Sequence, residues 1–173
     1  MKLKLFDKML IAILTVLFSA TAAWGAGSST TATGAWFGDT YYVTVSFTAD
    51  DGDGSIPDLT ISSSTNAVIY NTIKENNLFL YAADVVCNTG GTEVTDSSEF
   101  YVYMKSGGVT KAIDLMDGQG VDALSRSANE RFYPQSDGQA MVQRPYDTIT
   151  VDIDQQAAAT NSAAGTITLV FIQ

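Results

Sequence analysis

Apolar and polar residues alternate along several short stretches of the chain. In residues 41–47, Tyr41, Val43, Val45 and Phe47 fall on one side, and Tyr42, Thr44 and Ser46 fall on the other. Because successive side chains of a strand point to opposite faces of a sheet, this period of two predicts strands with one buried and one solvated face. The same pattern predicts strands near residues 59–61, 79–85, 100–104, 149–153 and 167–171, with weaker candidates at 109–115 and 140–144.

Helical signals are fewer. Residues 67–75 (AVIYNTIKE) predict a short helix capped by Asn66, and residues 121–131 hold enough helix-forming side chains for a second. Short strands separated by polar turns, with one or two short helices, predict an all-β fold. We expect an antiparallel β-sandwich of jelly-roll or immunoglobulin-like type, with a closed barrel as the alternative. The last two strands flank a loop of small residues, and we expect them to pair with each other.

The chain begins with the pattern of a secretory signal peptide. Lys2, Lys4 and Lys8 precede an apolar run at residues 9–18, and small residues then predominate up to Gly25. A membrane-spanning helix needs about 20 apolar residues, so the pattern favours a signal peptide over a membrane anchor. We expect residues 1–25 to be the signal peptide, 26–34 to be a flexible leader and 35–173 to form the β-sandwich domain.

The expected export sets the location of the protein, and its composition excludes two classes of partner. Removing residues 1–25 takes away three lysines and one aspartate, which leaves six basic and 18 acidic side chains and a net charge of about −12. This acidity argues against binding to nucleic acid or to anionic lipid surfaces. Because the chain begins with a signal peptide, we expect a secreted bacterial protein located in the periplasm, at the cell surface or outside the cell.

The scarcity of reactive side chains argues against most enzymatic mechanisms. The chain has no histidine, which excludes histidine-dependent catalytic triads and histidine-ligated zinc. Cys87, the single cysteine, follows a mostly apolar run and is expected to be a buried small side chain; an intermolecular disulfide or a reactive thiol is the alternative. We expect a non-enzymatic protein.

An acidic, glycine-containing loop is the strongest metal-site candidate. In DDGDGSIPD, which spans residues 50–58, the side chains of Asp51, Asp53, Ser55 and Asp58 offer the hard oxygens that calcium prefers. The loop departs from an EF-hand, because Ile56 occupies the position of the required glycine and no terminal glutamate follows. A solvated turn explains the same residues, since Asp, Gly and Pro are common turn formers. Apart from calcium, no cofactor is expected.

Two tyrosines are candidates for a binding surface. The apolar face of the predicted strand at 100–104 carries Phe100, Val102 and Met104. Tyr101 and Tyr103 therefore fall on the other face. Exposed aromatic side chains can stack on sugars or contact proteins. Cross-strand packing is the plainer interpretation of the same residues.

Four stretches of the chain share a pattern of strands and acidic or glycine-containing turns. They are residues 46–62, residues 100–104 with 114–124, residues 126–131, and the TITVDI and GTITLVFI segments near the end. In these stretches the chain resembles the small β-rich proteins encoded in the structural modules of tailed phages and prophages. The resemblance implies a β-rich fold and no catalytic residues, and the signal peptide departs from it because virion proteins assemble in the cytoplasm.

These observations favour an exported protein that acts through its surfaces, as a structural, assembly or adhesive module. The alternative is a calcium-dependent carbohydrate-binding module. Expected partners are a second copy of the chain, which the apolar final strand at residues 165–173 would contact if it lay at a sheet edge, or a cell-surface protein or glycan.

The calcium hypothesis gives the first testable prediction. If the loop at residues 50–58 binds calcium, a calorimetric titration of the protein with millimolar calcium shows saturable heat, because several carboxylates exchange water for the ion. A titration without binding heat in this range would remove the calcium site.

Overall fold

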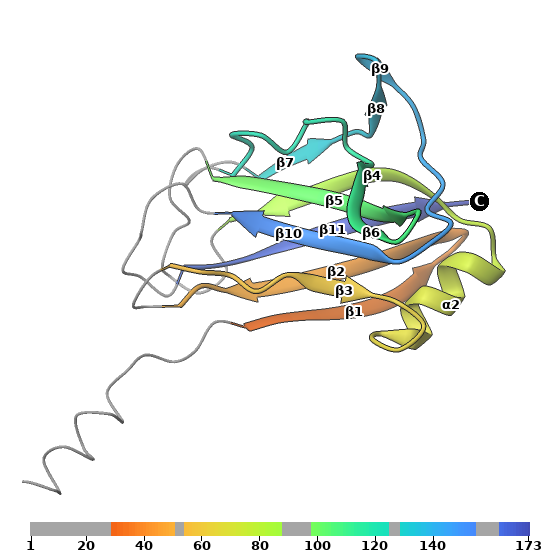
Figure 1. The fold of residues 1–173 in the computed structure, drawn as a ribbon, viewed down its shortest axis with the longest axis horizontal. Helices are drawn as coiled ribbons and strands as arrows, with labels where there is room; N and C mark the ends of the chain where they lie inside the picture. Colours follow the sequence, from red (N-terminus) through yellow and green to blue (C-terminus); the bar gives the residue numbers. More distant parts are fainter. Residues whose placement is uncertain (1–28, 51–53, 88–97, 125–128, 155–162) are drawn as a thin grey trace, which may run out of the picture.

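The computed structural model describes residues 29–50, 54–87, 98–124, 129–154 and 163–173 (Figure 1). These residues form two larger antiparallel sheets and one small hairpin. The expected signal peptide at residues 1–25 lies outside the described residues. No helix among the described residues has the length and apolar character to cross a membrane.

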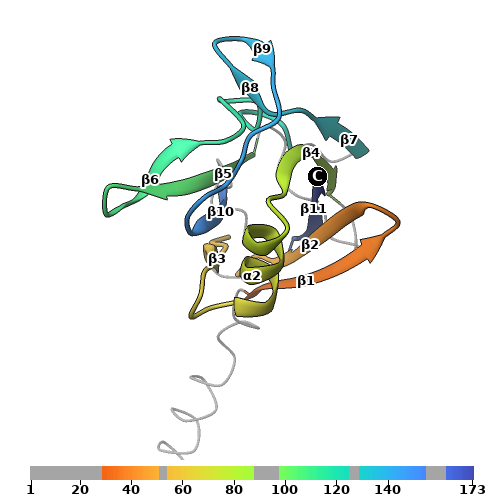
Figure 2. The ribbon, with the colours of Figure 1, turned by 90° about the vertical axis from the view of Figure 1, so that its right-hand side faces the viewer.

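The first sheet has five strands and the second has four. The five-stranded sheet has the order β1 (Ser29–Phe37), β2 (Thr40–Thr48), β11 (Ala164–Ile172), β4 (Phe79–Val86) and β7 (Asn129–Phe132). The four-stranded sheet has the order β3 (Leu59–Ile61), β10 (Ile149–Asp154), β5 (Glu99–Ser106) and β6 (Val109–Asp114). The hairpin of β8 (Gln135–Ser136) and β9 (Gln139–Ala140) stands apart from both (Figure 2).

A single apolar core joins the inner faces of the two sheets. The central strand β11 contributes Ile167, Leu169 and Phe171, and β5 contributes Phe100 and Val102 from the opposite sheet; all five are fully buried. The alternation seen in the sequence thus places every second side chain of these strands in the core. The prediction of an all-β antiparallel sandwich is confirmed.

The chain crosses repeatedly between the sheets. Strands that follow one another in sequence pair only in the hairpins β1–β2, β5–β6 and β8–β9, among the described residues. The expected pairing of the last two strands is wrong, because β10 pairs with β3 and β5 whereas β11 pairs with β2 and β4. Alternation shows which side of a strand is buried, but it does not identify the neighbouring strand.

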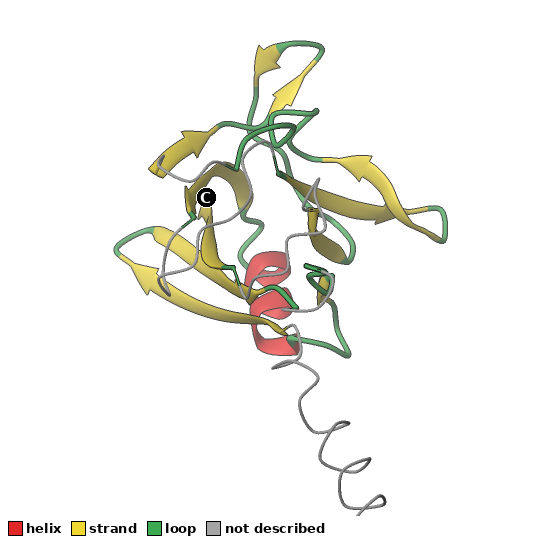
Figure 3. Ribbon diagram, turned by 90° about the vertical axis from the view of Figure 1, so that its left-hand side faces the viewer, coloured by secondary structure: helices red, strands yellow, loops and turns green. Residues whose placement is uncertain are grey.

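The predicted helix at residues 67–75 is confirmed as α2 (Ala67–Glu75), which lies at one end of the sandwich in Figure 1 and is the red helix of Figure 3. Ile69 and Ile73, one turn apart, are its buried residues. Asn66 precedes the helix in a left-handed conformation without a side-chain capping bond, and its amide donates instead to the carbonyl of Thr60 at 2.9 Å. The side chain therefore ties the helix start to β3.

Three other expectations need correction. Residues 29–34, expected to belong to a flexible leader, lie in β1, where β-branched threonines pair with β2 in a continuous nine-residue register. The described part of 121–131 forms a turn, a bridge at Leu124 and strand β7 rather than a helix. Of the strand candidate at 140–144, only Ala140 belongs to a strand, and Gln143 forms an isolated bridge to Leu80.

The position of β11 gives a stability prediction. Leu169 is fully buried between Val43 and Ala83, so Leu169→Ala should lower the free energy of unfolding by about 2–5 kcal/mol in urea denaturation. Thr166→Ala, a control on the outer face of the same strand, should cost about 0.5 kcal/mol or less. Equal effects of the two substitutions would contradict the assignment of the faces.

Candidate functional site

Tyr101 and Tyr103 lie on the outer face of the four-stranded sheet, as the sequence predicts. Their strand β5 buries Phe100, Val102 and Met104 on its inner side. The two tyrosine rings stack with centroids 5.2 Å apart and an angle of 14° between their planes. Each ring is only half-buried, so the pair forms a ridge on the protein surface.

A carboxylate holds Tyr101 in its protonated form. The Tyr101 hydroxyl donates a hydrogen bond to Glu99, two residues earlier on the same strand. This hydrogen bond is the main cause that raises the pKa of Tyr101, with burial second. Burial, followed by the nearby charges of Asp114 and Asp152, also raises the pKa of Tyr103. Both hydroxyls therefore stay protonated well above neutral pH, and the proton of Tyr101 is the one donated to Glu99.

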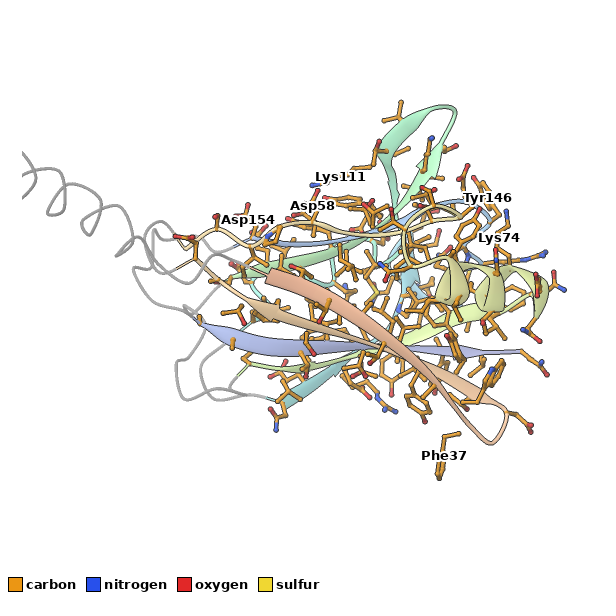
Figure 4. The ribbon with its side chains drawn as sticks, turned by 90° about the horizontal axis from the view of Figure 1, so that it is seen from below. Phe37, Asp58, Lys74, Lys111, Tyr146 and Asp154 are labelled. Atoms are coloured by element: carbon orange, nitrogen blue, oxygen red, sulfur yellow. The ribbon has the colours of Figure 1, made fainter. Side chains whose placement is uncertain are left out.

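Lys111 and two aspartates form a second cluster beside the tyrosines, here called the Lys111 cluster. The Lys111 Nζ atom lies 2.6 Å from Asp152 Oδ2 and 2.9 Å from Asp58 Oδ2. The same Nζ atom lies 5.8 Å from the centroid of the Tyr103 ring, within the range of a cation–π contact. The cluster thus joins β6, β10 and the residue just before β3, and Figure 4 shows Asp58 and Lys111 close together on this side of the molecule.

The electrostatics of the Lys111 cluster keep the lysine charged. Burial lowers the pKa of Lys111, but the hydrogen bonds with Asp152 and Asp58 outweigh it and raise the pKa overall. Burial raises the pKa of Asp152, and the neighbouring Asp58 adds to the rise while Lys111 opposes it. Ion pairs with this much exposure contribute at most about 1 kcal/mol each, so their main effect is to fix the positions of the charges.

A cavity of about 450 Å³ adjoins the Lys111 cluster. This volume falls within the range of small-molecule sites. The cavity lies between the loop that precedes β3 and the end of strand β10. Its lining residues are Gly54, Ser55, Ile56, Lys111, Asp152, Ile153 and Asp154.

The structure brings together only part of the predicted calcium site. Ser55 lines the cavity, and the carboxylate of Asp58 contacts Lys111. Asp51 and Asp53 lie outside the described residues, and the described part of the chain holds no group of three acidic, cysteine or histidine side chains placed to bind a metal. The loop closes through backbone bonds from Asp50 N to Ser55 O and from Gly54 N to Asp50 O. The calcium site stays a prediction.

Two residues outside the Lys111 cluster have plain structural roles. The carboxylate of Asp114 accepts the backbone N–H groups of Met116 and Gly118 at 2.9 and 2.8 Å, so it stabilises the turn that follows β6. Cys87 is buried in the core, which confirms the small-apolar interpretation.

The chemistry of the outer face of the four-stranded sheet suits the recognition of a ligand. A lysine paired with two carboxylates is a poor nucleophile and a poor base, and a tyrosine bonded to a carboxylate stays protonated. What the face offers is aromatic surface, fixed charges and hydrogen-bonding groups beside a cavity. These are the features of a site that binds a polar ligand.

Sequence reasoning missed Glu99, Lys111 and Asp152 as members of this site. The alternation in TVDID places Asp152 on a solvated face, but its contact with Lys111 depends on β10 lying beside β5 and near β6. The sequence contains no local signal for that strand order.

Comparison with known proteins adds no relative. No protein-family model matches the chain, and neither curated proteins nor solved structures give a significant match. The resemblance to phage structural proteins therefore stays a prediction.

The hydrogen bond between Tyr101 and Glu99 gives a prediction. Tyr101→Phe removes it and should lower the free energy of unfolding by about 1 kcal/mol in urea at pH 7. Because the folded-state pKa of Tyr101 is raised, this stabilisation is complete below about pH 10 and declines as the pH rises through the raised value. Tyr146→Phe, at an exposed tyrosine elsewhere, is the control and should change stability little. Equal effects of the two substitutions at pH 7 would contradict the assigned role of the hydroxyl.

Proposed function

We propose that the chain is an exported, non-enzymatic β-sandwich that works by binding, with the outer face of the four-stranded sheet as its ligand surface. One observation carries the proposal: the stacked pair Tyr101–Tyr103 lies beside the Lys111 cluster, which borders a cavity of about 450 Å³. Residues from β5, β6, β10 and the loop before β3 contribute to this one surface. The sheet fixes the spacing of these groups in advance, which lowers the entropic cost of binding.

A neutral carbohydrate is the ligand class that fits this chemistry best. Aromatic surfaces stack against the apolar faces of sugar rings, and sugar hydroxyls can both accept from tyrosine or lysine and donate to carboxylates. Carboxylates outnumber lysines here, since Asp58 and Asp152 contact Lys111, Glu99 contacts Tyr101 and Asp154 lines the cavity. Anionic glycans are therefore disfavoured.

Calcium-dependent carbohydrate binding is the second candidate. The observation that favours it is the position of Ser55 and Asp58 at the cavity and beside it, at the end of the acidic loop. A calcium ion held by this loop would lie near the proposed sugar surface and could coordinate sugar hydroxyls directly.

An array of neutral and anionic glycans, probed with and without a calcium chelator, tests both forms of the proposal. We expect wild-type protein to bind neutral glycans, and Tyr101→Ala and Lys111→Ala each to weaken binding at least about tenfold, since each removes a main contact of the face. Tyr81→Ala is the matched control, because Tyr81 is an exposed tyrosine on β4 of the five-stranded sheet, and it should bind like the wild type.

The outcomes separate the alternatives. Binding that survives chelation supports the calcium-independent form, and binding lost on chelation supports the calcium-dependent one. Binding that is unchanged in Tyr101→Ala and Lys111→Ala, or no binding to any glycan, would contradict the proposed carbohydrate site.

A further inference from the structure

Charge is distributed unevenly between the two sheets. The adjacent strands β1, β2 and β11, of nine residues each, contain no charged side chain, although the chain has 19 acidic and nine basic residues. In the same sheet, charged residues occur on the neighbouring strands β4 and β7, as in the ion pair of Asp84 with Arg131. Three of the five strands of this sheet are therefore uncharged within a strongly acidic protein, and the charge closest to them in sequence is Asp39 in the turn between β1 and β2.

Strand β1 forms the outer edge of these three uncharged strands. It lies at the end of the sheet order, and no described strand pairs with its free side. Along its outer face Thr31, Thr33, Ala35 and Phe37 are all exposed. A free strand edge carries unpaired backbone N–H and C=O groups, which can pair with another strand.

The other three edges of the two larger sheets have features that discourage strand pairing. Strand β1 has none of these features, and it contacts the loop before β3 at its start, through the hydrogen bond from Thr30 Oγ1 to the carbonyl of Pro57. Strand β3 has only three residues, and β7 has four, including Glu130 and Arg131. Strand β6 carries Lys111 and has a register irregularity opposite Met104 to Ser106. Short length, charge and bulges are the usual means by which proteins protect sheet edges. Strand β1 is long, uncharged, free of proline and regularly paired with β2.

Apolar surface accompanies this unprotected edge. A groove of about 460 Å³ lies between β1 and the start of α2, bordered by Ala32, Gly34 and Val68, and Val68 is 80% exposed. At the other end of β1, Phe37 is 81% exposed and Trp36 is partly exposed. Figures 2 and 3 show the β1–β2 hairpin reaching away from the body, and Figure 4 shows Phe37 pointing into solvent.

We propose that β1 is a self-association edge, at which the β1 strands of two copies pair antiparallel and join their five-stranded sheets into one. The occupant is a second copy because an antiparallel pair of identical strands is self-complementary about a twofold axis and closes as a dimer. Charge supports this choice, since two copies of a protein with net charge −10 repel each other least where both surfaces are neutral. The inference does not depend on the ligand face proposed above.

Sedimentation velocity of the purified protein over a range of concentrations tests the proposal. We expect a monomer–dimer equilibrium that moves toward the dimer as ionic strength rises, because salt screens the repulsion between acidic copies without weakening neutral strand pairing. Amide hydrogen exchange in β1 should slow as the dimer forms, since its free N–H groups become paired.

A matched pair of variants locates the contact. Thr33→Lys places a charge on the exposed face of β1 and should raise the dissociation constant of the dimer at least about tenfold. Thr110→Lys makes the same change on the exposed edge strand β6 and should leave the dimer intact. Circular dichroism verifies that both variants fold.

Three results would overturn the proposal. The first is a protein that stays monomeric up to about 1 mM. The second is a dimer that survives Thr33→Lys or is dissociated by Thr110→Lys. The third, which needs no variant, is a wild-type dimer in which hydrogen exchange of β1 is unchanged.

Discussion

The packing of two apolar sheet faces against each other is the constraint on which the rest of the structure depends. Once Phe100, Val102 and Met104 fill the core, the tyrosines between them must face outward. The same rule turns Asp152 outward on β10, where it meets Lys111. The candidate ligand face is thus a geometric consequence of the core, because side chains in a strand have only two directions available.

The two outer surfaces that result differ in chemistry. The four-stranded sheet presents tyrosines, carboxylates and a lysine beside a cavity, whereas the β1, β2 and β11 part of the other sheet presents mainly threonines and apolar residues without charge. If two copies join through β1 about an axis perpendicular to the sheet, both four-stranded sheets lie on the same side. Such a dimer would present two copies of the ligand face toward one surface, and avidity would raise weak affinities.

The sequence predicts which face of a strand is buried better than it predicts which strands lie side by side in a sheet. The all-β class, the helix at 67–75 and the outward position of Tyr101 and Tyr103 follow from local periodicity, and the structure confirms them. The Lys111 cluster depends on which strands adjoin β10, and that order is set by packing of the whole chain. Composition is also misleading for β1: its glycine and small polar residues are typical of a flexible leader, but nine residue pairs with β2 hold it in the sheet.

The central claim is that the outer face of the four-stranded sheet binds a ligand. Mapping backbone and side-chain chemical shifts by nuclear magnetic resonance, during titration with a neutral oligosaccharide, tests it most directly. The account predicts shifts that saturate and that cluster at Tyr101, Tyr103, Lys111 and Ser55. Saturating shifts confined to the five-stranded sheet, or none at millimolar oligosaccharide, would contradict it.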